Sequence, residues 1–221
     1  MMCMTVLLAG CNAADMEQQI DELYAKMSQE ERIAQLRSTY MDDFFDEKGV
    51  LDTAKCHKVI PFGIGHFSQY ASQKPIDPNV LRDRVAAMQD WLMHHTPNGI
   101  PALFHEEVLS GVNTQGATIY PQQIGQACSF NTELAEQKTL QTGTAMRKMG
   151  GVLSLSPMVD VCRTPVSTVW RSRMARTATC RQPWEQPSSA ACSKATCARA
   201  WEPAQNTTWA MAVAVKPKRR N

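Results

Sequence analysis

Apolar residues recur at the spacing of an α-helix in four stretches of the chain. Three of these stretches open on a residue that can cap a helix, namely Ser28, Asp77 and Asn131. Ser28 also forms a capping box with Glu31, and a proline follows Asp77. The pattern predicts helices over 15–27, 28–36, 77–96 and 132–149. Their apolar faces are predicted to carry Ile20, Leu23, Tyr24 and Met27 in the first helix, Ile33 and Leu36 in the second, and Val80, Leu81, Val85, Met88, Trp91 and Leu92 in the third.

Three short apolar runs lack helical spacing and predict buried strands. They lie within 60–70, which includes P-F-G-I-G-H-F, and over 100–104 and 152–155. Residues 42–58 are mixed and charged and predict a loop. Strands that alternate with helices at this spacing predict right-handed crossovers and a parallel sheet or barrel of the α/β class. In such folds the working residues follow the C-terminal ends of the strands.

Polar residues follow two of these strands. His105, Glu106 and Glu107 come after the first, and Asp160 and Arg163 come after the second. Carboxylates accept hydrogen bonds from sugar hydroxyls and arginine donates them, so this set suits a polyhydroxylated ligand. Two alternatives are a metal site at the first cluster, although no H-E-x-x-H spacing is present, and solvated charges at the strand ends.

Adjacent residues limit how many of these groups can share one pocket. Glu106 and Glu107 point in different directions, so at most one of them is expected in the pocket. The pair His94-His95 ends the third predicted helix, where cations are favoured, and is interpreted as a helix-terminus feature rather than a metal site.

Composition alone suggests one soluble domain, with 221 residues of which 43% are hydrophobic and 20% charged. The charge, however, is divided between two unlike segments. Residues 166–221 hold ten Lys and Arg against two Glu, whereas residues 1–165 hold 13 basic and 19 acidic residues. The small net charge of +2 is therefore a sum of +8 and −6, and the join lies just after Pro165.

The N-terminus carries an export signal of the lipoprotein type. A short apolar run from Met4 leads into Leu8-Ala9-Gly10-Cys11, the pattern at which a bacterial lipoprotein is cleaved and lipidated on cysteine. The run has no Lys or Arg before Cys11, and a fortuitous L-A-G-C is the alternative. We predict a signal over 1–11, lipidation of Cys11, and a periplasmic or outer-membrane-anchored lipoprotein that meets the membrane only through this lipid.

Four motifs stand in a fixed order along the predicted domain. They are G-I-P-A-L-F-H-E-E-V-L-S-G (99–111), G-A-T-I-Y-P-Q-Q-I-G (116–125), S-F-N-T-E-L (129–134) and L-S-P-M-V-D-V-C-R-T-P (155–165).

In this order and spacing the four motifs resemble the N-terminal (β/α)8-barrel domain of glycoside hydrolase family 3, the β-glucosidase and β-xylosidase type. The resemblance covers about residues 17–165. It implies an α/β fold, the N-terminal part of a TIM-like barrel, with a partial domain over 12–165 that is incomplete. It also implies hydrolysis of O-glycosyl bonds in β-linked oligosaccharides or aryl glycosides, with retention of configuration and with no cofactor.

The resemblance assigns two substrate-binding residues. Glu107 stands where family members usually have an Asp that holds sugar hydroxyls in the −1 subsite, and Arg163, in V-C-R-T-P, matches the subsite arginine of V-x-R-D-P. Thr164 replaces the usual Asp and Ser110 replaces a frequent His, which leaves the sugar specificity open.

The resemblance stops at Pro165, and the tail over 166–221 is predicted to be out of frame. Shifting the reading frame by two bases turns Met174-Ala175 into a forced glycine and lets 173–180 read H-G-E-D-G-Y-L, as in the family. Further forced glycines fall at family positions, at Trp184-Glu185, Trp209-Ala210 and Met211-Ala212. We predict a frameshift close to residue 166 and a tail that is irregular or disordered, in which the cysteines form no zinc or disulfide framework and the basic end binds no nucleic acid.

Family members carry the nucleophile, an Asp, and the acid/base, usually a Glu, beyond the point that matches Pro165. The chain is therefore expected to contain no catalytic residue and to be inactive, and Asp160 is not expected to substitute. A barrel with only its first βα units is expected to expose strand edges and to be poorly stable or aggregate. The alternatives are a glycan-binding surface lipoprotein without hydrolytic activity and a pseudogene product. The oligomeric state is left open.

Overall fold

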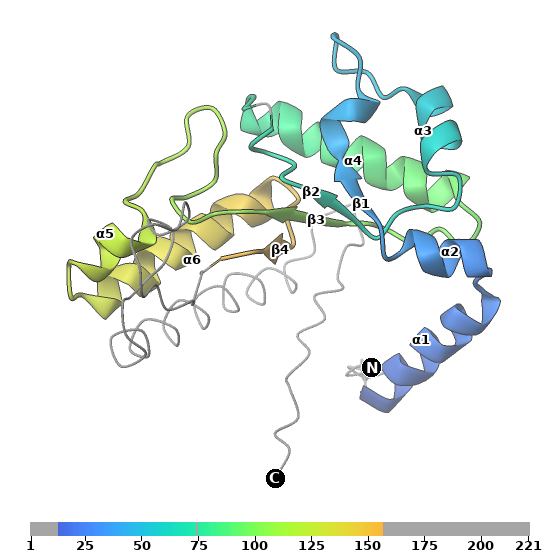
Figure 1. Cartoon of the computed structure of the whole chain (residues 1–221), viewed down its shortest axis with the longest axis horizontal. Coiled ribbons are helices and arrows are strands. Elements are labelled where there is room, and N and C mark those ends of the chain that lie inside the picture. The colour runs from blue at the N-terminus through green and yellow to red at the C-terminus, as the bar shows by residue number, and fades with distance from the viewer. Residues whose placement is uncertain (1–12, 74, 157–221) are drawn as a thin grey trace, which may run out of the picture.

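The structure is a computed structural model that describes residues 13–73 and 75–156 (Figure 1). Several predicted features lie outside these residues, namely Cys11 and its signal, Asp160, Arg163 and the tail over 166–221. Within the described ranges, no helix is long and apolar enough to cross a bilayer.

The centre of the fold is a parallel sheet of four strands in the order β1-β2-β3-β4. Each strand pairs with the next one along the chain; for example, Phe67 lies opposite Phe104, and His105 opposite Leu153. The predicted parallel α/β arrangement is confirmed. The strands are β1 (Ser38–Tyr40), β2 (His66–Ser68), β3 (Leu103–Glu106) and β4 (Leu153–Ser154).

Helices begin where the capping signals predicted them. Ser28 and Glu31 form the capping box, and the side chain of Asn131 accepts from the backbone N–H of Leu134. The histidine pair lies in the last turn of the fourth helix, as predicted. The helical elements are α1 (Ala13–Lys26), α2 (Gln29–Ala34), the 3₁₀ helix η1 (Met41–Phe44), α3 (Thr53–Val59), α4 (Pro78–His95), α5 (Gln123–Ala127) and α6 (Thr132–Lys148).

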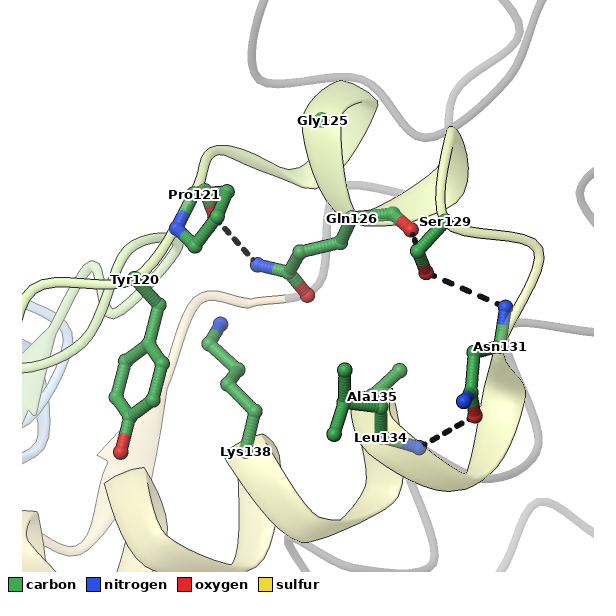
Figure 2. A pocket seen from close by; sticks show the side chains of 9 residues that line it. All are labelled: Tyr120, Pro121, Gly125, Gln126, Ser129, Asn131, Leu134, Ala135 and Lys138. Carbon is green, nitrogen blue, oxygen red and sulfur yellow. Dashed lines mark hydrogen bonds between the residues drawn. The ribbon is translucent and has the colours of Figure 1, made fainter.

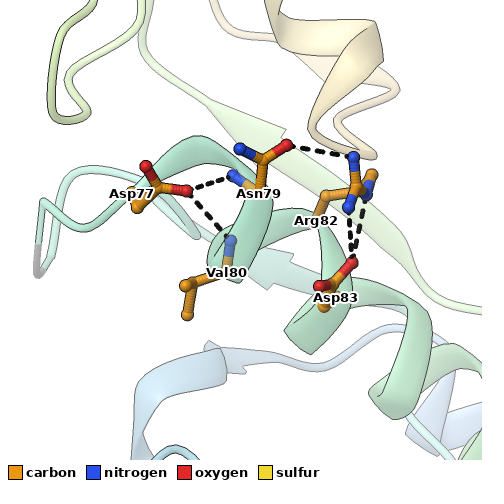
Figure 3. Close-up of polar contacts among 5 residues, drawn as sticks. All are labelled: Asp77, Asn79, Val80, Arg82 and Asp83. Atoms are coloured by element: carbon orange, nitrogen blue, oxygen red, sulfur yellow. Dashed lines mark hydrogen bonds and ion pairs between the residues drawn. The ribbon is translucent and has the colours of Figure 1, made fainter.

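The first turn of α4 is held by polar side chains (Figure 3). An Asp77 carboxylate oxygen accepts from the backbone N–H groups of Asn79, at 2.8 Å, and Val80, at 3.4 Å. Arg82 donates to the Asn79 side chain and pairs with Asp83 at 2.9 Å. Val80 is 45% exposed, so its predicted place in the buried stripe is wrong; the other five members of that stripe are buried.

One face of the sheet forms the core against α4, which runs along it in Figure 1. The rings of Phe67 and Phe104 stack at 5.0 Å between centroids, and Phe44 meets Phe67 edge-on at 6.0 Å. Leu81, Met88 and Leu92 of α4 are at most 1% exposed and belong to the same cluster. Removal of this apolar surface from water is the main force that holds the helices on the sheet.

The opposite face of the sheet is open. Side chains alternate between faces along a strand, so Tyr40, Leu103 and Leu153 project away from the phenylalanine core. They are 44%, 44% and 39% exposed. In a closed (β/α)8 barrel this face would line the packed interior. The open face, defined by these three residues together with Ser38, His66, Ser68 and His105, agrees with an incomplete barrel.

The start of β2 depends on a glycine. A Cβ atom on Gly65 would lie 1.8 Å from the carbonyl oxygen of Gln35. The backbone of Gly65 donates to Ala34 and accepts from Leu103, which ties the end of α2 to the sheet. Any larger residue would separate these elements.

Three predictions about where elements form or end also differ from the structure. The loop predicted over 42–58 contains η1 and α3, and β1 forms where no strand was predicted. In α3 only Cys56 is buried, so the segment shows no apolar period. The second helix ends at Ala34, and Leu36 beyond it is 84% exposed.

The apolar face predicted for 15–27 does not join the core. Ile20, Leu23 and Tyr24 of α1 are 49%, 36% and 55% exposed. In Figure 1 this helix extends away from the sheet.

Candidate functional site

The candidate site lies at the C-terminal end of β3. The strand covers Leu103–Glu106, so it starts and ends later than the predicted 100–104 and includes two of the three polar residues. Because sides alternate, Glu106 shares the core face with Phe104, whereas Glu107 continues the open-face series of Leu103 and His105. Glu106 is completely buried and Glu107 is exposed.

Glu106 fastens the loop after β2 to β3. One carboxylate oxygen accepts from the backbone N–H of Ala71 at 2.9 Å and of Ser72 at 3.0 Å. The other accepts from the Ser72 hydroxyl at 2.7 Å and from the backbone N–H of Glu107 at 3.0 Å. Four donors therefore satisfy a charge that would otherwise be costly to bury. Burial, together with the charge of Glu106, raises the pKa of the neighbouring Tyr70 hydroxyl.

Glu107 is left as the glutamate that can meet a ligand. Its backbone is fixed by the bond to Glu106, and its side chain is free to face solvent at the rim of the open face. The two adjacent glutamates thus differ in burial, and the prediction that at most one of them serves a pocket stays a prediction.

Two histidines lie next to Glu107 on the open face. The rings of His66 and His105 are 5.1 Å apart between centroids. Burial lowers the pKa of His105, and the neighbouring His66 lowers it further, while Glu106 and Glu107 act in the opposite direction. His105 is 6% exposed and its Nδ1 has no hydrogen-bond partner. The Nδ1 atom is therefore a buried polar group without a hydrogen-bond partner in the described chain.

A metal site at this cluster lacks ligands. Among residues 13–73 and 75–156, no group of three or more His, Cys, Asp or Glu side chains converges as metal binding requires. Both carboxylate oxygens of Glu106 also already accept hydrogen bonds from other donors.

The loops that follow β3 and β4 are joined at the same rim. The backbone N–H of Val108 donates to the Ser156 hydroxyl at 3.1 Å, which links the two strand ends. Gly111 has a φ of +99°, and a Cβ there would lie 2.5 Å from the carbonyl oxygen of Thr118, so the turn needs glycine. The backbone N–H of Tyr120 closes the loop on the carbonyl of Ser110 at 2.8 Å.

A family model described as "Glycosyl hydrolase family 3 N terminal domain" matches residues 28–175. The chain belongs to glycoside hydrolase family 3. The parallel sheet and the rim at the end of β3 are thus the first part of this family's TIM-barrel-like domain.

Known relatives of this family 3 domain agree with the assignment. A putative β-xylosidase of Formosa agariphila is 30% identical over 158 residues, which cover 67% of this chain and 20% of that protein. The structure of a β-glucosidase from Erythrobacter marinus matches with a TM-score of 0.65 and 25% identity, over 83% of this chain and 22% of the other. A β-glucosidase from Listeria innocua matches with a TM-score of 0.65 and 18% identity, over 83% and 24%. The chain spans about a fifth of the length of these relatives.

Of the two predicted substrate-binding residues, the structure describes only Glu107. Glu107 lies at the rim where the resemblance requires a sugar-binding carboxylate, and its role stays a prediction. Arg163 lies outside the described residues. Sequence reasoning missed the His66–His105 pair and the anchoring role of Glu106. Glu106 lies two residues after Phe104, so the two side chains share one face of the strand. The buried position of Glu106 could therefore have been inferred once Phe104 was known to be buried.

Proposed function

We propose that this family 3 domain binds the glycone of a β-linked glucoside or xyloside, with Glu107 accepting hydrogen bonds from sugar hydroxyls in the −1 subsite. The observation that carries the proposal is the different environment of the two adjacent glutamates at the end of β3. Glu106 is buried and fully bonded, whereas Glu107 is exposed at the C-terminal rim. An exposed carboxylate on a backbone fixed by its neighbour suits recognition of a polar ligand.

The substrate class rests on the names of relatives. These include a putative β-xylosidase and a Listeria innocua β-glucosidase variant in complex with laminaribiose, a β-linked glucose disaccharide. We infer that Arg163 donates to the same sugar, because it matches the subsite arginine in the family motif. No cofactor is needed for this reaction class.

We infer further that the chain binds sugar without cleaving it. A retaining glycosidase needs two carboxyl groups about 5 Å apart, one as nucleophile and one as acid/base. Glu106, the carboxylate next to Glu107, is committed to four donors and is unsuited to either role. The family resemblance assigns both catalytic groups to positions beyond Pro165.

Titration of the full chain with glucose and xylose, followed by calorimetry or ligand-observed NMR, tests this function. We expect saturable binding that Glu107→Gln weakens about ten-fold, the loss of one charge-assisted hydrogen bond. Glu47→Gln, an exposed glutamate far along the chain from the rim, serves as the matched control and should bind as the parent does. Equal affinity for both variants would refute the role of Glu107.

The absence of hydrolysis has its own assay. Release of nitrophenol from aryl β-glucoside and β-xyloside should not exceed that of a preparation carrying both Glu107→Ala and Arg163→Ala. Turnover that these substitutions abolish would overturn the non-catalytic reading. Resequencing the gene across codons 160–175 separates a confirmed frameshift, which supports a pseudogene product, from an open frame that restores the enzyme.

We also propose that Cys11 carries a lipid and anchors the domain in the periplasm or at the outer membrane. The support is the L-A-G-C motif alone. Cells expressing the full chain should incorporate labelled palmitate into it, and Cys11→Ser should abolish the label and release the protein from the membrane fraction.

A further inference from the structure

A small hollow lies between the loop that follows Tyr120 and the first turns of α6 (Figure 2). Its volume is about 130 Å³, which is several times that of a water molecule. The surface that lines it is mainly apolar, and its lining residues include Tyr120, Pro121, Leu134 and Ala135. The hollow is thus an apolar site with room for a molecule of a few heavy atoms.

The side-chain amine of Lys138 lies beside this apolar surface. The Lys138 side chain projects from α6 toward the space between Tyr120 and Gln126 (Figure 2). Its Nζ donates to the carbonyl oxygen of Leu109 at 2.8 Å and lies 5.9 Å from the centre of the Tyr120 ring. This hydrogen bond fixes the direction of one N–H bond, and it thereby limits the directions in which the other substituents and the lone pair of the nitrogen can point.

The surroundings disfavour a charge on this amine. The residues of the described chain that line the hollow include no carboxylate. Burial lowers the pKa of Lys138 to about 8. A substantial share of the amine is therefore neutral near physiological pH, with a lone pair available for reaction.

We propose that Lys138 is a modification site at which small aldehydes, seated in the hollow beside Tyr120 and Leu134, form an imine with the ε-amino group. The nitrogen lone pair attacks the carbonyl carbon, a C–N bond forms and the C=O π bond breaks to give a carbinolamine. The carbinolamine then loses its hydroxyl and the nitrogen proton as water. No oxidant or reductant takes part. The residues that line the hollow do not include Glu107, and the proposal does not depend on the proposed sugar binding.

Another lysine on the same helix provides an internal comparison. Lys148, in the last turn of α6, is exposed, whereas Lys138 is half-buried. Both residues experience the same reagent in the same protein. A difference in reaction rate between the two lysines is therefore caused by their surroundings and not by the reagent.

The test is brief treatment of the full chain with acetaldehyde at about pH 7, in the presence of sodium cyanoborohydride, which reduces the imine to a stable ethylamine. Peptide mapping by mass spectrometry then gives the rate at each lysine. We expect Lys138 to react about ten-fold faster than Lys148, and its rate to level off above about pH 8. Equal rates at the two lysines would overturn the proposal.

Two variants separate the hollow from the lysine alone. Lys138→Arg should remove the fast site and leave Lys148 unchanged. Leu134→Trp, which fills the hollow from a position that is 56% exposed, should slow Lys138 about five-fold or more without removing the amine. Labelling of Lys138 at the parent rate in Leu134→Trp would show that the hollow plays no part.

Discussion

Glu106 and Glu107 are chemically identical neighbours whose positions on the strand give them opposite roles. Glu106 lies on the core face, where four donors surround its carboxylate. Glu107 lies one residue further and faces solvent. A substitution at each position should therefore separate stability from ligand binding.

Glu106→Gln is expected to destabilise the fold by about 2 kcal/mol or more. Each carboxylate oxygen accepts at least one backbone N–H, so the amide NH₂ of glutamine must face a donor whichever way it turns. Urea unfolding followed by circular dichroism measures the change. Glu107→Gln is the matched control and should stay within about 0.5 kcal/mol of the parent; a similar loss in both variants would contradict the assigned roles.

The stability of the domain should fall as the pH is lowered from about 6.5. The folded state lowers the pKa of His105 through burial and through the nearby His66, so the unfolded chain binds the proton more readily. The unfolded state then holds more protons in this window, and the free energy of unfolding decreases with falling pH until it passes the lowered pKa. Well above the unfolded pKa of about 6.5 this residue is neutral in both states, and its contribution is flat.

His105→Gln should flatten that dependence. The measurement is a series of denaturant unfolding curves across the pH range, with His94→Gln, an exposed histidine in the last turn of α4, as control. If the free energy of unfolding depends on pH with the same slope in both variants, His105 is not the cause of the pH dependence.

Helix starts are the elements that sequence reasoning located best. The signals are local, since Ser28, Asp77 and Asn131 each accept from a backbone N–H two or three residues ahead. By contrast, α3 escaped prediction because Cys56 is its only buried side chain. Its position depends on tertiary packing, which leaves no period in the sequence.

The extent of β3 was mispredicted for a related reason. Apolar character suggested 100–104, yet Leu103 is exposed while His105 and Glu106 are buried. Glu106 can end the buried strand because hydrogen bonds from a neighbouring loop satisfy its carboxylate. Which of the two glutamates reaches the rim could be decided only when Phe104 was fixed in the core.

Asp77→Ala should remove the cap of α4 and cost about 1 kcal/mol. The substitution removes the two hydrogen bonds that the backbone N–H groups of Asn79 and Val80 donate to Asp77, drawn in Figure 3. Thermal unfolding reports the change. Asp83→Ala, which breaks only an exposed ion pair with Arg82, should change stability by about 0.5 kcal/mol or less, and the cap assignment is wrong if the two substitutions cost the same.

At the scale of the whole molecule, the open face dominates behaviour in solution. Tyr40, Leu103 and Leu153 place apolar surface on one side of a sheet whose other side carries Phe67 and Phe104 of the core. Exposed apolar patches next to strands favour association between chains. We expect the full chain to self-associate as its concentration rises.

Leu153→Lys should reduce that association with little loss of stability, because Leu153 is 39% exposed and a lysine there can reach water. Sedimentation velocity over a concentration series measures the associated fraction. Val50→Lys, at a residue that is 61% exposed in a loop away from the sheet, is the control and should leave the fraction unchanged. Unchanged association in Leu153→Lys would exclude the open face as its cause.

The strand order has a consequence for synthesis of the protein. Each strand pairs with the one translated just before it, from β1 through β4. The sheet can therefore be extended by one strand and its connecting helix at a time as the nascent chain leaves the ribosome, without waiting for a distant partner. Once β3 has left the ribosome, Glu106 can already bind the loop that follows β2 and hold it against β3, before β4 is available.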